Sequence, residues 1–153
     1  MAVYFIDSSA LVKRYVKETG TAFVTDISDP ATAHRLYAAR ITVVEVVAAL
    51  ALRGRAGDIA ADALAATLTQ FRQEFTTLYR IVEITSALLS DAMRLAESRA
   101  VRGYDAVQLA AALRVHSECT ALGLSATLVS ADGDLNGAAV AEGLAVANPN
   151  TVP

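Results

Sequence analysis

Residues 3–7 read Val-Tyr-Phe-Ile-Asp, four apolar residues followed directly by an acid. An apolar run of this length without polar alternation is typical of a strand buried on both faces, as the strands of parallel sheets are. In open α/β sheets, ligands bind just beyond the carboxyl ends of the strands. The sequence therefore predicts a buried first strand and places Asp7 at the sheet edge where a site would form.

The rest of the chain alternates between short apolar runs and longer segments rich in Ala and Leu. Further strands are expected over residues 35–42, 79–84, 127–130 and 144–147, and helices over residues 10–18, 21–28, 41–52, 58–75, 86–99, 105–119 and 135–142. We expect Ser8 or Ser9 to cap the first helix, Gly20 to end it, and residues 53–58 to form a turn. This order predicts a single α/β domain over residues 1–153, with a central parallel sheet of about five strands and helices on both faces.

The composition is that of a globular protein. The hydrophobic content is 54% and the charged content only 19% over 153 residues. The net charge of −3 argues against a broad basic surface for nucleic acid, although a local patch remains possible. Cys119 is the only cysteine, so an intrachain disulfide is excluded and a reducing cytoplasm is expected. We expect no membrane association, because no uninterrupted apolar stretch approaches the ~20 residues of a span.

Glu45 lies inside an apolar stretch that runs from Ile41 to Leu52. We expect a helix here from the Ala and Leu content, although the four valines would also suit a strand. A buried carboxylate is costly unless it acquires a cation, a metal or a proton. Arg40 and Arg53 are off the favourable one-turn spacings from Glu45. Other carboxylates are therefore expected to share a cation with it.

Three more acids can lie on the same rim of the sheet as Glu45. Asp7 follows the first strand, Asp105 opens a helix after Gly103, and Asp132 comes shortly after the strand over residues 127–130. Each also has a simpler interpretation. Asp7 could cap a helix, Asp105 suits the positive end of a helix dipole, and Asp132 could belong to a turn. The joint arrangement is what favours a site.

Clustered carboxylates need a cation to remain ionised together. Two such charges 4 Å apart repel by roughly 4 kcal/mol at an effective dielectric constant of 20. Ligands that are all oxygen, without cysteine or paired histidine, favour Mg²⁺ or Mn²⁺ over Zn²⁺. Because Mg²⁺ commonly takes phosphate as a further ligand, the acids point to phosphoryl or phosphodiester chemistry.

The motifs around these acids resemble those of the PIN-domain ribonucleases, in particular the VapC-type toxins of toxin–antitoxin pairs. The resemblance covers essentially the whole chain and is carried by residues 7–15 around Asp7, 42–50 around Glu45, 102–110 around Asp105, 128–132 ending at Asp132, and 142–144. Each motif alone is weak, but four in order at suitable spacing are a strong signal.

This resemblance implies a PIN-like fold and an endoribonuclease that depends on Mg²⁺ or Mn²⁺. It also implies an antitoxin partner that blocks the site and a homodimer. The catalytic and metal-binding residues would be Asp7, Glu45, Asp105 and Asp132, with Ser8 and Ser130 contacting substrate or supporting the acids. Asp134 competes with Asp132 for the fourth position, which is the least constant in the family. Hydrolysis by water would leave 5′-phosphate and 3′-hydroxyl ends.

Two other classes remain as alternatives. A haloacid-dehalogenase-like phosphatase also starts with an acid after the first strand, but it needs a second Asp where Ser9 stands. A receiver-like or other non-catalytic protein-binding domain would need an acidic pair after the first strand and a late lysine. Asp7 is followed by serine, and no lysine follows Lys17.

Overall fold

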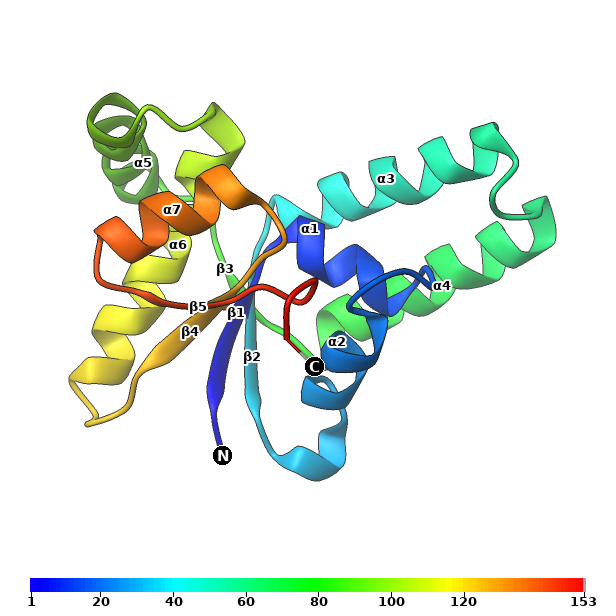
Figure 1. Cartoon of the computed structure of the whole chain (residues 1–153), viewed down its shortest axis with the longest axis horizontal. Helices are drawn as coiled ribbons and strands as arrows, with labels where there is room; N and C mark the ends of the chain where they lie inside the picture. Colours follow the sequence, from blue (N-terminus) through cyan, green and yellow to red (C-terminus); the bar gives the residue numbers. More distant parts are fainter. Residues whose placement is uncertain (153) are drawn as a thin grey trace.

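The computed structural model describes residues 1–152 and contains one five-stranded parallel sheet (Figure 1). The strands lie in the order β3-β2-β1-β4-β5, so the first strand is the central one. Their bounds are β1 Val3–Ile6, β2 Arg35–Ala39, β3 Arg80–Val82, β4 Ala126–Val129 and β5 Ala145–Ala147. All four strand pairs are parallel, which confirms the predicted fold class.

Helices cover both faces of the sheet. The helical elements are α1 Ser8–Leu11, η1 Val12–Arg14, α2 Thr21–Ile27, η2 Pro30–Thr32, α3 Thr42–Ala56, α4 Ala61–Thr77, α5 Ser86–Arg99, α6 Gly103–Thr120 and α7 Gly133–Ala141. One core cluster contains residues of α5, α6 and α7, and the other contains residues of α1, α2, α3 and α4. Among residues 1–152, no helix combines the length and the apolar character that a membrane span requires.

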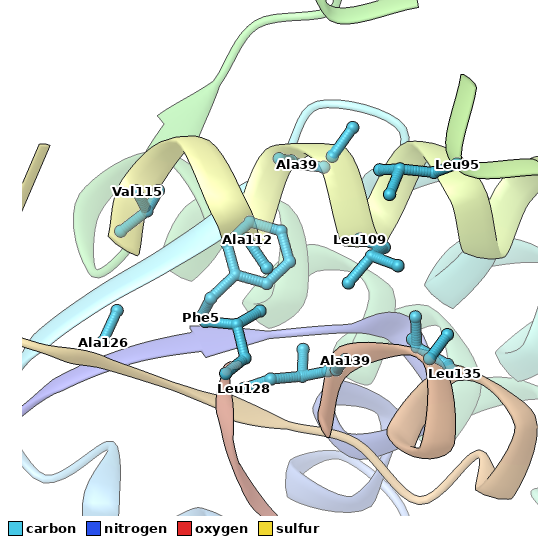
Figure 2. Close-up of a cluster of buried hydrophobic side chains, with 14 of the residues drawn as sticks. Phe5, Ala39, Leu95, Leu109, Ala112, Val115, Ala126, Leu128, Leu135 and Ala139 are labelled. Atoms are coloured by element: carbon cyan, nitrogen blue, oxygen red, sulfur yellow. The ribbon is translucent and has the colours of Figure 1, made fainter. Parts of the chain in front are cut away.

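The central strands send successive side chains to opposite faces of the sheet. Phe5 and Leu128 lie in the cluster with α6 and α7, which Figure 2 shows in close-up. Ile6 and Val129, one residue further along, lie in the cluster on the other face. Because both faces are buried, β1 and β4 are apolar at consecutive positions, as the sequence indicated.

The chain after β1 differs from the prediction in its helix boundaries. Asp7, rather than Ser8 or Ser9, caps α1, because it has extended backbone angles and its carboxylate accepts a hydrogen bond from the Ala10 N–H. The helical segment ends at Arg14 instead of residue 18. Gly20 therefore does not end it. Gly20 precedes α2 with φ +90, where an added Cβ would approach the Pro149 carbonyl oxygen at 2.6 Å.

The turn predicted over residues 53–58 lies further along the chain. Helix α3 continues to Ala56, and α4 starts only at Ala61. A Cβ at Gly54 would meet a methyl group of Leu64 at 2.5 Å, so the absence of a side chain lets the two helices approach closely. Figure 1 shows that α3 and α4 form a hairpin that projects away from the sheet. The base of this hairpin is fixed by Phe71 and Phe75, which are buried.

Candidate functional site

The strand order defines where a site can form. The chain places β2 and β3 on one side of β1, then crosses to place β4 and β5 on the other side. The carboxyl ends of β1 and β4 therefore meet at a topological switch point, where α/β sheets bind their ligands. Asp7 directly follows β1, and Asp132 closely follows β4.

The other two acids reach this rim from helices. Helix α6 leads into β4, so it runs opposite to the strands and presents its N-terminal turn, with Asp105, at their carboxyl ends. Glu45 lies in the first turn of α3, the helix that follows β2. All four acids that the sequence singled out therefore lie at the same end of the sheet.

Asp7 is 3% exposed and is surrounded by donors. The Ser9 hydroxyl donates to its Oδ1 at 2.8 Å, the Ala10 N–H donates at 3.1 Å, and the Ser130 hydroxyl donates to Oδ2 at 3.2 Å. Burial nevertheless dominates and raises the pKa of Asp7 to about 7 from an ordinary value of 3.8. Capping of α1 accounts for one of these bonds, but it does not require a buried carboxylate.

Glu45 is half-buried and is held from two sides. The Ser8 hydroxyl donates to its Oε2 at 2.7 Å, and the side-chain amide of Gln108 donates to its Oε1 at 3.0 Å. The same amide donates to the Thr42 hydroxyl at 2.9 Å. Gln108 is 1% exposed, so it anchors Glu45 from inside the protein.

Asp105 and Asp132 share one cationic side chain. Arg102 donates to Asp105 through Nε at 3.2 Å and to Asp132 through Nη2 at 3.1 Å. Burial, followed by the nearby charge of Asp132, raises the pKa of Asp105. Asp132 also caps α7 through the Leu135 N–H, whereas the Asp134 side chain is exposed and takes part in none of the side-chain hydrogen bonds found within residues 1–152.

Polar bridges connect the two halves of this rim. The Ser130 hydroxyl that donates to Asp7 accepts a hydrogen bond from the Asp132 N–H at 3.1 Å. The Ser9 hydroxyl that donates to Asp7 accepts one from the Ala131 N–H at 2.9 Å. A cavity of about 640 Å³ lies where Glu45 and Asp105 are found and is lined by Glu45, Val107 and residues 102–105. We call Asp7, Glu45, Asp105 and Asp132, together with this cavity, the acidic rim.

The acidic rim supplies carboxylate oxygens, which hard divalent cations prefer, but its acids are not grouped into a metal site within residues 1–152. Within residues 1–152, no three His, Cys, Asp or Glu side chains are grouped as a metal site. Asp7 and Glu45 form no ion pair in that part of the chain, and Arg102 compensates the other two acids. The Arg102 side chain is 76% exposed, so water screens its ion pairs and they are readily exchanged.

Three residues that contact the four acids were not assigned to the site from the sequence. Ser9, rather than Ser8, contacts Asp7, while Ser8 contacts Glu45. Gln108 could have been noticed as the one polar residue in an otherwise apolar run, three positions after Asp105. Arg102 lies three positions before Asp105, a spacing at which the two side chains can form an ion pair. The contact of Arg102 with Asp132, thirty residues away, has no local signal.

The chain is similar to known proteins in sequence and in structure. No family model matches the chain. However, it is 36% identical over 115 residues to ribonuclease VapC45 of Mycobacterium tuberculosis (strain CDC 1551 / Oshkosh). The matched residues make up 75% of this chain and 78% of that protein. The chain has the same identity and coverage with ribonuclease VapC49 of Mycobacterium tuberculosis (strain ATCC 25618 / H37Rv).

The chain belongs to the VapC ribonuclease family. This confirms the family resemblance that the four acidic motifs predicted. Solved structures share the VapC fold at low sequence identity. The structure of FitAB bound to an IR36 DNA fragment has a TM-score of 0.69 at 16% identity, covering 98% of this chain and 97% of that one. The structure of VapBC2 from Rickettsia felis, bound to a promoter DNA fragment, has a TM-score of 0.63 at 12% identity. The match covers 95% of this chain and 98% of that one.

Proposed function

We propose that this VapC-family chain is an endoribonuclease that depends on Mg²⁺ or Mn²⁺ and acts as the toxin of a toxin–antitoxin pair. The observation that carries the proposal is the acidic rim, where Asp7 is buried, forms no ion pair within residues 1–152 and lies at the same end of the sheet as three further acids. The names of the two curated relatives supply the substrate class, which is RNA. Because RNA substrates lie in the cytoplasm, we place the activity there.

In this proposal Asp7, Glu45, Asp105 and Asp132 would hold the cation. When bound, the cation would activate a water molecule and stabilise negative charge that develops at the scissile phosphate. The chain's own residues prepare this arrangement. Ser9 and Ser130 fix the orientation of Asp7, and Ser8 fixes Glu45. Since the pKa of Asp7 is raised to about 7, binding of a cation must displace a proton there near neutral pH.

The chemistry is tested by incubating the purified chain with an unstructured RNA in Mg²⁺ or Mn²⁺. We expect cleavage that stops in EDTA and returns when the cation is restored. Because water is the nucleophile, the products should carry 5′-phosphate and 3′-hydroxyl ends, which ligation and end-labelling report. Cleavage that persists in EDTA, or products with 2′,3′-cyclic phosphates, would contradict the proposal.

Gln108 gives a second test, because it supports an acid without being one. Gln108→Leu keeps a similar volume but removes the donor to Glu45 and to Thr42. Loss of such a supporting contact costs roughly 10- to 100-fold in activity or metal affinity, and we expect a loss of cleavage in that range. Gln73→Leu, on the exposed side of α4, is the matched control. Equal cleavage by both variants would mean that Glu45 needs no anchoring.

We further propose an antitoxin partner and a homodimer. The structural neighbours include FitAB bound to an IR36 DNA fragment and VapBC2 bound to a fragment of promoter DNA, and both names join two components. On this chain, the large apolar side chains Val44 and Leu52 on α3 are 61% and 60% exposed. They are separated by eight positions and so lie on one face, suited to a protein contact. A strictly monomeric species in sedimentation at micromolar concentration would remove the homodimer.

A further inference from the structure

Tyr104 is exposed at a place where an aromatic ring has a use. Among the exposed large apolar side chains of residues 1–152, it is the only aromatic one, with an exposed fraction of 63%. A single exposed apolar residue needs no explanation by itself. Tyr104, however, lines the cavity of the acidic rim together with Glu45 and Asp105. The ring makes no aromatic pair within the described chain, so one face is available to a ligand.

The charge around this cavity limits how RNA can be held. Of the residues that line it, Arg102 is the only cation, and the whole chain carries a net charge of −3. Phosphate contacts alone supply affinity in proportion to the number of phosphates neutralised, so they contribute little here. Stacking of a base on an aromatic ring contributes without any charge and accepts every base. Tyr104 is the side chain of this cavity that can provide it.

Arg102 lies beside Tyr104 and suits the adjoining phosphate. Its guanidinium has five N–H donors, and the contacts with Asp105 and Asp132 use Nε and Nη2. The side chain is 76% exposed, so the remaining donors are accessible. A base on Tyr104 and its phosphate on Arg102 would place the backbone of one nucleotide next to Glu45 and Asp105.

From this juxtaposition we propose that Tyr104 is the stacking platform for an unpaired nucleobase of the RNA substrate, with Arg102 binding the adjacent phosphate. The inference rests on the proposed ribonuclease function and adds a substrate requirement to it. A base within a duplex has both faces covered by its neighbours, so stacking on Tyr104 requires a single-stranded segment. Tyr104 is then a positioning residue for the nucleotide beside the scissile phosphate.

The test measures the equilibrium binding of a fluorescein-labelled single-stranded RNA and of a matched hairpin duplex. Fluorescence anisotropy in the presence of EDTA reports the binding. Stacking contributes about 1–3 kcal/mol per base, so Tyr104→Ala and Tyr104→Leu should weaken single-strand binding by roughly 5- to 150-fold. Tyr104→Phe keeps the ring and should stay within about twofold of the unmodified protein. Duplex binding should not change in any variant. Because Tyr104 is exposed, none of these changes should alter the fold, which circular dichroism verifies.

A spectroscopic readout separates stacking from a merely structural role. The chain has no tryptophan, so Tyr104→Trp introduces a single reporter. Its fluorescence should be quenched by single-stranded RNA at the concentrations that saturate anisotropy. Leu122→Trp is the matched control, because Leu122 is 71% exposed just beyond the opposite end of α6. That reporter should be unaffected by RNA.

The outcomes distinguish this inference from the function on which it rests. If the unmodified protein binds and cuts RNA, but Tyr104→Ala binds single strands equally well, the stacking role is wrong and the nuclease proposal stands. Absence of quenching in Tyr104→Trp, or equal weakening for the duplex, also overturns the inference. If the unmodified protein neither binds nor cuts RNA, both proposals fall.

Discussion

Asp7→Asn and Asp105→Asn should each reduce RNA cleavage by roughly 10³-fold or more while the protein stays folded. Each change removes one negative ligand from the acidic rim and keeps the side-chain shape. A divalent cation supplies several kcal/mol of transition-state stabilisation, and about 1.4 kcal/mol corresponds to a factor of ten in rate. Initial rates at saturating Mn²⁺, measured with the same RNA, report the loss directly.

Two other substitutions serve as comparisons for this series. Asp26→Asn, on the exposed surface of α2, should cut RNA at the unmodified rate. Asp132→Asn should lose more activity than Asp134→Asn, because Asp132 bonds Arg102 and caps α7 whereas Asp134 is exposed. Full activity in Asp7→Asn, with a folded control spectrum, would remove the acidic rim from the reaction.

In EDTA at pH 8, Asp7→Asn should be more stable than the unmodified protein. Burial raises the pKa of Asp7 to about 7 from 3.8, so the folded state binds this proton more tightly than the unfolded state does. Asp7 therefore favours the fold fully below about pH 4, and this contribution is lost as the pH rises through 7. At about 1.4 kcal/mol per pKa unit, the loss is at most about 4 kcal/mol.

Urea unfolding at pH 4, 6 and 8 measures this effect. The stability advantage of Asp7→Asn should be largest at pH 8 and should vanish near pH 4, with Asp26→Asn as the control. The asparagine can still accept from the Ala10 N–H, and the Ser9 and Ser130 hydroxyls can rotate to accept from its amide. Mn²⁺ at pH 8 should stabilise the unmodified protein and not the variant. An advantage that is independent of pH would contradict the raised pKa.

Together, these two results would show that Asp7 lowers the stability of the cation-free protein and is required for RNA cleavage. The substitution that removes catalysis would strengthen the cation-free fold, because a buried carboxylate is unfavourable until a cation neutralises it.

The sequence predicted the sheet well, because its signals are local and unambiguous. The short apolar runs before Asp7 and before Ser130 are typical of buried parallel strands, and in the structure the two runs pair with each other. The helix boundaries were harder to predict. Gly54 was interpreted as part of a turn, whereas in the structure it permits close contact with Leu64 inside a continuous hairpin. A tertiary contact of this kind overrides local propensity and leaves no mark in the sequence.

The acids were found from their positions relative to strands and helices, but their partners were not. Gln108 reaches Glu45 across sixty-three positions, and Arg102 reaches Asp132 across thirty. Such contacts depend on how α6 packs against α3 and α7, which periodicity does not encode. The assignment of each acid to catalysis stays a prediction that the substitutions above address.

The position of β1 at the centre of the sheet has a consequence for the timing of toxicity during synthesis. The strand that carries Asp7 is made first, yet one of its two edges pairs only with β4, which begins at Ala126. The Ser130 hydroxyl that binds Asp7 also comes from that late segment. A ribosome that is still making the chain therefore holds an incomplete acidic rim. If the acidic rim cuts RNA as proposed, the nascent chain would gain this activity only after nearly the whole polypeptide has emerged and β4 has paired with β1.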